Sequence, residues 1–370
     1  MGRLYSLAVA AGILARLYFV AFTVGTTDVI FKTMWGHLAA VYGVAGAYAH
    51  HPLLNHPPLS VFIFARLYDL APAIGLEFAN LLRLLQVLAD IGSAACLFIL
   101  GRRYASLFFF LSPAAIFISG FHCNTDPTMV CLILAAVVFF AKERPVASGI
   151  ALGLATGIKI LPLLIVPLFF IRTPRRWRFA IAYALTFAAI FAPVLLRSRA
   201  AFSNIFLYRS VGNWWGPVSM LTWLHRPDLV QLYSRINVLV LLAVVSFAMW
   251  RFRARDVASA IAFVYLLVVA LGAGFGVQYL LWPLAFLPFA LSKRWALAVN
   301  ALISFFLFVV YTAWSGELPW NFADAQRPGV TTDSLVFLGW VVWLALIAAS
   351  VASAIRSRES LPQWEPARSS

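Results

Sequence analysis

The sequence predicts an all-α polytopic membrane protein with about 12 transmembrane helices in one domain, residues 1–355. Three observations predict this class. Of the 370 residues, 63% are hydrophobic and 11% are charged, and the mean hydropathy is +0.90, so the chain lacks the polar surface of a soluble fold. Its apolar segments are long enough to cross a membrane. The net charge of +15 comes from short Lys and Arg clusters between these segments, which is typical of cytoplasmic loops and not of a nucleic-acid-binding face.

The basic clusters give the order of the spans, because the positive-inside rule places each cluster on the cytoplasmic side. We expect spans at 4–24, 78–100, 104–120, 127–141, 147–171 as a hairpin of two, 179–196, 231–250, 257–274, 278–291, 295–313 and 334–355. Both termini are then cytoplasmic, and the polar tail 356–370 is expected to be disordered. Three long outer loops, 25–77, 197–230 and 314–333, place the functional surface at the periplasmic or lumenal face. The expected location is the inner membrane of a prokaryote, or the ER membrane of a eukaryote.

Two segments do not fit a simple crossing. Residues 59–74 are short and carry Arg66 and Asp69, so we expect a helix lying at the outer membrane surface. Residues 147–171 have a basic cluster at each end, which predicts a hairpin of two short helices broken near 157–162. Half-helices of about 12 residues reach only about 18 Å. Lys159 would therefore lie at the hairpin tip in the outer half of the membrane, where a broken helix must be buried in protein or line a cavity.

Ionisable side chains among apolar segments are the first candidates for a site, because charge is expensive in lipid. Asp28 follows the first span within Gly25-Thr-Thr-Asp-Val29. Its carboxylate could accept a proton from a substrate hydroxyl as a general base. The alternative is an N-cap for the helix expected over 29–48, since Asp is a favoured capping residue.

Two other outer segments carry side chains suited to a site. The loop Phe121-His-Cys-Asn-Thr-Asp-Pro127 places His122, Asn124 and Asp126 between two spans. A tight turn uses Asn, Asp and Pro, but it does not need a histidine. His56 precedes two prolines that force an extended backbone, which could present the imidazole to a cavity. His50, His51 and His56 lie near Asp28 in the sequence, so a metal site is conceivable, but no ligand pair at helical spacing supports one.

Lys159 and Arg209 are the candidates for binding an anion. Lys159 lies beyond the reach of inner lipid headgroups if the hairpin prediction holds. Arg209 neighbours three tryptophans in an outer loop, and this cluster is either an interfacial aromatic belt or a groove where the arginine contacts phosphate. Gln278 and Tyr279 open a span at the outer face, where they either hydrogen-bond a sugar or phosphate or serve as ordinary interfacial residues.

A polar stripe on the second span has a structural interpretation. Arg83, Gln86 and Asp90 follow one another at spacings of three and four, so they share one helix face. Arg16 on the first span could join them. We expect buried pairing here, in preference to catalysis.

Together these features resemble glycosyltransferase superfamily C, integral-membrane enzymes that use polyprenyl-phosphate-linked sugars as donors. Asp28 has the place of an aspartate that follows the first span. Asn55-His-Pro-Pro-Leu59 is similar to the Tyr-Pro-Pro-Leu of the asparagine-linked-glycosylation glucosyltransferases and of bacterial mannosyltransferases, with His56 in place of Tyr. The second outer loop matches loosely, at His122 and Asn124. The segment 144–162, a Gly-rich helix ending at Ile-Lys and followed by Pro, resembles the bacterial pattern.

The resemblance covers residues 1–215 and leaves 216–355 as a more variable module. It implies an inverting transfer of a hexose, with mannose as the first expectation, to a lipid, glycan or protein acceptor. Asp28 would be the catalytic base, and Lys159 and Arg209 would stabilise the leaving polyprenyl phosphate. His56, His122, Asn124, Asp126, Gln278 and Tyr279 would form the substrate pocket. The resemblance implies no metal and no cofactor.

A secondary transporter or lipid flippase is the rival hypothesis. It would use Asp28, Asp126 and Lys159 as coupling or binding groups and would need access from both faces. The outer position of the polar groups, the short inner loops and the lack of a sequence repeat between the two halves weigh against it.

Overall fold

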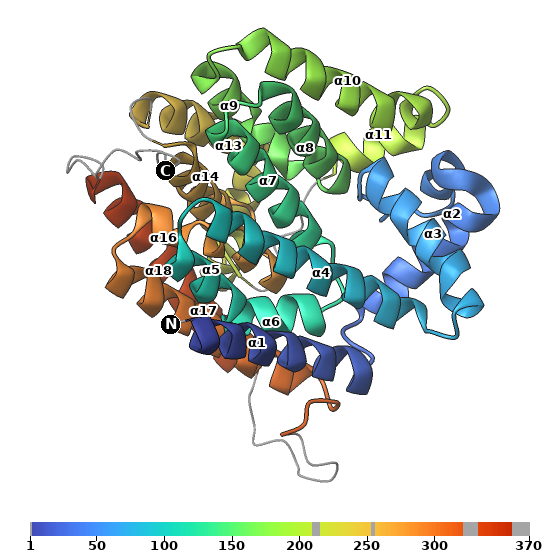
Figure 1. The fold of residues 1–370 in the computed structure, drawn as a ribbon, viewed down its shortest axis with the longest axis horizontal. Helices are drawn as coiled ribbons and strands as arrows, with labels where there is room; N and C mark the ends of the chain where they lie inside the picture. Colours follow the sequence, from blue (N-terminus) through green and yellow to red (C-terminus); the bar gives the residue numbers. More distant parts are fainter. Residues whose placement is uncertain (1, 209–214, 253–255, 321–331, 357–370) are drawn as a thin grey trace.

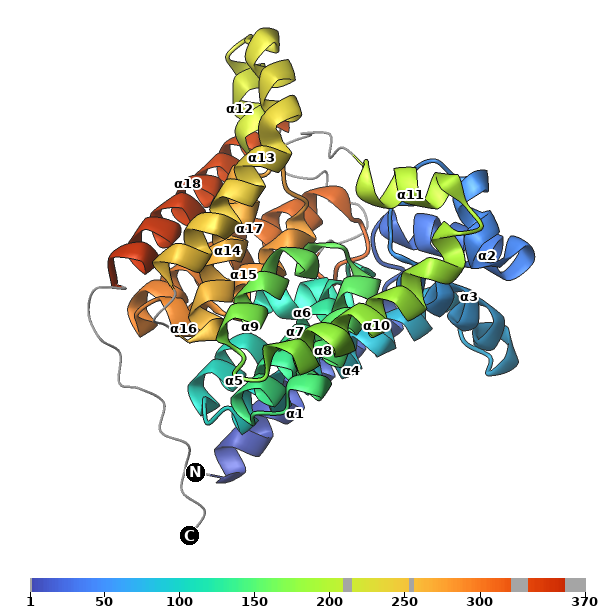
Figure 2. The ribbon, with the colours of Figure 1, turned by 90° about the horizontal axis from the view of Figure 1, so that it is seen from above.

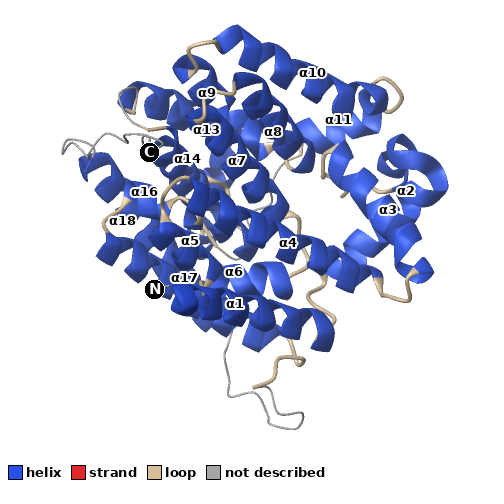
Figure 3. Cartoon of the chain, in the orientation of Figure 1, coloured by secondary structure: helices blue, strands red, loops and turns tan. Residues whose placement is uncertain are grey.

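Every regular element in the part of the chain that the structure describes is a helix (Figure 3). The computed structural model describes residues 2–208, 215–252, 256–320 and 332–356. Helices of the first half of the chain form one layer, and helices of the second half pack beside it (Figure 1, Figure 2). The predicted all-α class is confirmed.

Within the described residues, six helices are long and apolar enough to cross a membrane. They are α1 (Gly2–Phe22), α4 (Phe78–Ile99), α10 (Arg176–Leu195), α13 (Pro227–Arg251), α17 (Lys293–Trp314) and α18 (Thr332–Arg356). The pair α5 (Arg103–Phe110) and α6 (Pro113–Gly120) gives a seventh crossing if it is one span bent by 56°. The chain is therefore a multi-pass membrane protein.

The remaining predicted spans are helical but short, so the expected number of about 12 crossings is not confirmed. Helices α7 (Asp126–Ala141), α8 (Pro145–Ile158) and α14 (Val257–Leu271) have 16, 14 and 15 residues. At 1.5 Å per residue these lengths reach only about 21 to 24 Å, less than the roughly 30 Å hydrocarbon core. Residues 278–291 are divided further, into η2 (Val277–Leu280), α15 (Leu281–Leu284) and α16 (Leu287–Ala290). Composition identifies an apolar stretch, but it does not show where prolines and turns divide it.

The predicted break in residues 147–171 is present. Helix α8 ends at Ile158 because Lys159 has extended backbone angles, φ −141° and ψ 147°. Pro162 then lies within the short helix η1 (Leu161–Ile165), which leads into α9 (Val166–Arg172). The Ser60 hydroxyl donates a 2.7 Å hydrogen bond to the Ile158 carbonyl at the end of α8. A neighbouring helix thus holds the break, where Lys159 and Ile160 are half-buried and Pro162 is buried.

Residues 25–77, which the sequence predicts to be an outer loop, fold into a small lobe beside the helical layer (Figure 1). The lobe contains α2 (Asp28–His50) and α3 (Pro58–Ala73), which pack together, and α11 (Arg199–Phe206) lies against α2 (Figure 2). The surface helix predicted over 59–74 corresponds to α3. Trp35, Phe64 and Leu54 belong to an apolar cluster in this lobe. Burial of these side chains lets the lobe hold Asp28 and His56 in fixed positions.

Buried ion pairing confirms the structural interpretation of the polar stripe on α4. The Arg16 guanidinium lies 2.8 Å from the Asp90 carboxylate, and both side chains are fully buried. Arg83 donates hydrogen bonds of 2.6 Å to the Thr23 carbonyl and 3.2 Å to the Val20 carbonyl. These carbonyls belong to the end of α1, where no helical donor is left for them. Arg83 therefore fixes the point at which the chain leaves α1 and approaches Asp28.

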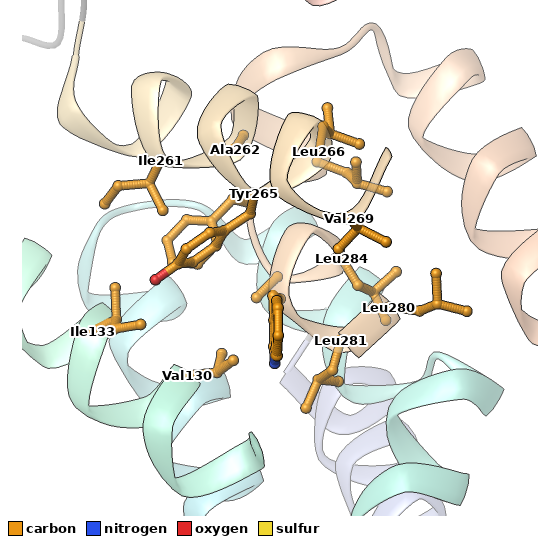
Figure 4. Close-up of a cluster of buried hydrophobic side chains, with 14 of the residues drawn as sticks. Val130, Ile133, Ile261, Ala262, Tyr265, Leu266, Val269, Leu280, Leu281 and Leu284 are labelled. Carbon is orange, nitrogen blue, oxygen red and sulfur yellow. The ribbon is translucent and has the colours of Figure 1, made fainter. Parts of the chain in front are cut away.

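A separate apolar core joins α7 to the second half of the chain. Figure 4 shows Val130 and Ile133 of α7 opposite Tyr265 of α14, with Leu281 of α15 beside them. All four side chains are fully buried. This packing brings the start of α7, at Asp126, next to α15.

Candidate active site

The polar residues predicted from the sequence gather around one cavity of about 390 Å³. Its walls come from α2, the loop before α3, the break after α8, the end of α11, and η2 with α15. Of the predicted site residues, Asp28, His56, Asn124, Lys159, Gln278 and Tyr279 line it. The volume falls within the usual range for small-molecule sites. Arg209 lies outside the described residues, although its neighbour Tyr208 lines the cavity.

Asp28 is a cavity side chain and not a helix cap. Thr27 occupies the N-cap position of α2 without a side-chain capping bond. The Asp28 Oδ2 atom accepts hydrogen bonds of 2.6 Å from Lys32 Nζ and 2.6 Å from Asn124 Nδ2. His122 Nε2 lies 3.5 Å from the same oxygen. The side chain is 26% exposed and lines the cavity together with Lys32 and Asn124.

These partners decide the charge of Asp28. Removal of the carboxylate from water would raise its pKa, but Lys32 and His122 more than offset this effect and hold the pKa well below its ordinary value. Asp28 is therefore ionised at neutral pH. An ionised carboxylate at a cavity wall can take a proton from a hydroxyl group.

The loop between α6 and α7 supplies the support for Asp28. His122 is not part of the cavity lining, and its Nδ1 atom lies 2.9 Å from the Tyr311 hydroxyl of α17. The His122 carbonyl accepts a 2.7 Å hydrogen bond from Thr26, two residues before Asp28. Cys123 has a φ of 64°, which makes the loop tight. This loop therefore positions the carboxylate from two sides.

Lys159 also lines the cavity, and the buried carboxylate of Asp126 holds it there. Its ammonium lies 2.7 Å from Asp126 Oδ1, and Asp126 is fully buried. Trp282 Nε1 donates to the same oxygen at 2.5 Å. Asp126, expected to shape the pocket itself, instead lies behind the wall and orients the lysine. The reason is that α7 starts at Asp126 and is packed tightly against α15.

Two aromatic rings lie beside the lysine. Tyr279 and Trp282 are stacked with ring centroids 4.2 Å apart, and the Lys159 ammonium lies 5.1 Å and 5.4 Å from their ring centroids. Both rings line the cavity. Such a pair stabilises the cation and offers a flat apolar face next to it.

His56 contributes a neutral imidazole to the cavity. Burial lowers its pKa well below the ordinary value, the charges of Lys32 and Lys159 lower it further, and Asp28 opposes them only in part. The ring packs against Trp35 with centroids 5.3 Å apart. The backbone is extended at the first of the two prolines, since Pro57 has a φ of −60° and a ψ of 161°.

Three residues of this site were not singled out by the sequence. Lys32 had a readable signal, because it lies one helical turn after Asp28 on a helix expected in the outer loop. Trp282 and Tyr311 had none, because each is one aromatic residue in an apolar span until the fold brings it to a polar partner. Among the described residues, no group of three or more His, Cys, Asp or Glu side chains is placed to hold a metal ion.

Comparison with known families completes the description. A sequence model described as glycosyltransferase family 87 matches residues 53–277, which is more than half of the chain. The matched segment includes the cavity residues His56, Asn124 and Lys159 and ends in η2. No curated protein matches the chain.

Proposed function

The chain belongs to glycosyltransferase family 87, and from this premise we propose that it is an inverting hexosyltransferase that uses a polyprenyl-phosphate sugar. The transferred sugar is mannose in the first instance, and the acceptor is a hydroxyl of a lipid, glycan or protein. Transfer takes place at the periplasmic or lumenal face of the membrane. The donor is a substrate, and the proposal includes neither a metal nor a cofactor.

One observation carries the proposal: an ionised carboxylate and an ammonium face the same cavity, each held by its own buried partners. Asp28 is bonded to Lys32 and Asn124, and Lys159 to Asp126. A transfer from a sugar phosphate needs both groups, a base for the attacking hydroxyl and a cation for the leaving phosphate. A membrane glycosyltransferase whose cavity is built on a break between apolar helices is suited to a substrate that itself resides in the membrane.

The proposed reaction is a single displacement. Asp28 takes the proton of the acceptor hydroxyl as its oxygen forms a bond to the anomeric carbon. The bond from that carbon to the phosphate oxygen breaks on the opposite face, and its electron pair stays on the phosphate. The phosphodiester monoanion thereby becomes a phosphate monoester dianion, which Lys159 stabilises. Arg209 is proposed as a second phosphate contact.

The remaining cavity residues have proposed roles in binding the sugar. Tyr279 and Trp282 offer a stacked aromatic face to the pyranose ring, and Gln278 and His56 offer hydrogen-bonding groups. His122 and Asn124 keep the Asp28 carboxylate in place. Asp126 keeps Lys159 in place.

The test uses purified full-length protein with radiolabelled polyprenyl-phosphate mannose and a membrane lipid extract. We expect label to move from the polyprenyl carrier to a new product, and we expect Asp28→Asn to transfer at most about one hundredth as much label in the same assay. A panel of polyprenyl-phosphate hexoses then identifies the sugar. Retention of all label on the carrier, together with its movement across the bilayer of a proteoliposome, would replace the proposal with the flippase hypothesis.

A further inference from the structure

We propose that Lys32 is a further phosphate-binding group, which pairs with Asp28 while that carboxylate is ionised and moves to the leaving phosphate when Asp28 takes the acceptor proton. This inference rests on the proposed function and deepens it. It adds a catalytic residue that neither the sequence pattern nor the family match assigns.

The first step of the argument is the position of the lysine. Lys32 is 3% exposed, yet it lines the cavity together with Lys159. Among the described residues, its ammonium has one hydrogen-bond acceptor, Asp28 Oδ2 at 2.6 Å, and it lies 5.3 Å from the Trp35 ring centroid. A lysine ammonium carries three donors on a flexible stem. It can therefore turn to a second acceptor within the same cavity.

The second step is the difference between the two lysines. Asp126 is fully buried behind the wall, and it also accepts a hydrogen bond from Trp282, so Lys159 keeps its partner throughout the reaction. Asp28 faces the cavity and is the group that gains a proton. Once neutral, it no longer offers Lys32 an ion pair.

The third step is the movement of charge during transfer. The acceptor proton neutralises Asp28 at the moment when the phosphate gains its second negative charge. Negative charge thus disappears beside Lys32 and appears at the phosphate in the same cavity. A cation that follows this charge stabilises the transition state more than the ground state, which is the condition for acceleration.

The same argument predicts how the product leaves. While Asp28 holds its proton, Lys32 and Lys159 both bind the phosphate dianion. Loss of that proton to water restores the Asp28 carboxylate, and Lys32 then pairs with Asp28 again. The phosphate loses one of its two cationic contacts and binds more weakly. Product release is therefore coupled to deprotonation of Asp28.

The decisive variant is Asp28→Asn, because an amide imitates the neutral, protonated acid. Binding of a short-chain polyprenyl monophosphate is measured by calorimetry in detergent for the full-length protein. We expect Asp28→Asn to bind this probe at least about tenfold more tightly than the wild type, since it gains a charge-assisted hydrogen bond. The gain should disappear in Asp28→Asn combined with Lys32→Met. It should persist in Asp28→Asn combined with Lys142→Met, a matched control on an exposed lysine outside the cavity.

A tighter complex could also result from the loss of one negative charge in the cavity. A structure of Asp28→Asn with the bound probe shows whether Lys32 contacts the phosphate, and it does not require a Lys32 variant to fold. We expect Lys32 Nζ within hydrogen-bond distance of the phosphate. A lysine that stays on residue 28, or Asp28→Asn affinity no higher than that of the wild type, would overturn the inference and leave the proposed function intact. Absence of any binding by the wild type and by Lys142→Met would count against the proposed function itself.

Discussion

At the scale of single residues, the cavity depends on two buried arrangements that each hold one charge. Asp28 is fixed by Lys32, Asn124 and His122. Lys159 is fixed by Asp126, which is itself held by Trp282. Each arrangement contains a group that faces substrate and others that position it. Substitution of a group that faces the substrate should therefore remove a step of the reaction, whereas substitution of a supporting group should displace the group that it holds.

Asp28→Asn is the first prediction at this scale. The amide keeps the size of the side chain but cannot take a proton, so transfer should fall by roughly 10²- to 10⁴-fold, the usual contribution of a general base. The rate is measured with saturating donor and acceptor. Size-exclusion chromatography checks that the variant is intact. Turnover close to that of the wild type would remove Asp28 from the base role.

Lys159→Met tests the phosphate contact. Loss of one charge-assisted hydrogen bond should weaken donor engagement by roughly 10- to 100-fold, and the measurement is donor KM together with kcat/KM. Arg144→Met, which removes an exposed cation outside this cavity, is the control. Equal donor kinetics in the two variants would contradict the assignment of Lys159.

The pH dependence follows from the lowered pKa of Asp28. A carboxylate with a depressed pKa is ionised above that value and loses its charge only as the pH falls through it. Wild-type kcat/KM should therefore show no fall from protonation of Asp28 above about pH 3.9, the ordinary Asp value. The charge of Lys32 is the main effect that lowers the pKa of Asp28 against burial. In Lys32→Met this pKa should rise, so the acid limb of the profile should move to higher pH. An unchanged profile in this variant would contradict the role of Lys32 in holding Asp28 ionised.

At the scale of elements, the position of Asp28 depends on a short connection between α1 and α2. Gly25 has a φ of 103°, and a Cβ atom there would lie 2.8 Å from the Phe121 carbonyl oxygen. The Val24 amide donates a 2.7 Å hydrogen bond to Glu317, at the end of α17. The connection is thus fixed from the α6–α7 loop and from the second half of the chain.

Gly25→Ala is the prediction for this connection. The added methyl group meets backbone and adopts an unfavourable φ, at a cost of about 1–3 kcal/mol, so the connection should shift and carry Asp28 with it. We expect a lower melting temperature and a fall in kcat. Gly75→Ala is the matched control, because Gly75 also has a positive φ, 69°, but nothing lies within 4 Å of its Cβ position. Similar losses of kcat in both variants would show that backbone strain alone explains the effect.

Local sequence predicted the ends and breaks of helices wherever a single residue type determines the backbone conformation. The break after α8 was predicted from Gly157 and Pro162, and the surface helix α3 from the charges that exclude residues 59–74 from a span. The predicted number of about 12 membrane crossings is not confirmed, because the count depends on where neighbouring helices tolerate short or bent segments. A hydropathy pattern carries no information about those neighbours.

At the scale of the whole molecule, the cavity is completed by both halves of the chain. Asp28, His56 and Lys159 come from the first half of the chain, whereas Tyr279 and Trp282 come from the second half. The sequence identified the charged groups of the site because charge stands out among apolar residues. It missed Trp282 and Tyr311 because an aromatic residue in a span acquires its role only through a long-range contact. Arg209 lies outside the described residues and stays a prediction.

Trp282→Phe tests the contribution of the second half. Phenylalanine keeps an aromatic ring but removes the donor to Asp126, which costs roughly 1–3 kcal/mol because Asp126 is a fully buried carboxylate. We expect a lower melting temperature and a raised donor KM, with the acid limb of Asp28 unchanged. Trp223→Phe serves as the control, since this ring is 63% exposed. A donor KM equal to that of the wild type would show that Lys159 keeps its position without the indole.

The pairing of each lysine with its own carboxylate has a consequence for how the protein resists the wrong ligand. Because Lys32 is paired with Asp28 and Lys159 with Asp126, the formal charges of these four side chains cancel, so small mobile anions from the surrounding water gain little by entering the cavity. A polyprenyl-phosphate donor is already held in the bilayer by its polyprenyl chain, so only a modest attraction for its phosphate group is needed to bind it. Millimolar inorganic phosphate should accordingly be a poor inhibitor of an enzyme that recognises a lipid-borne phosphate.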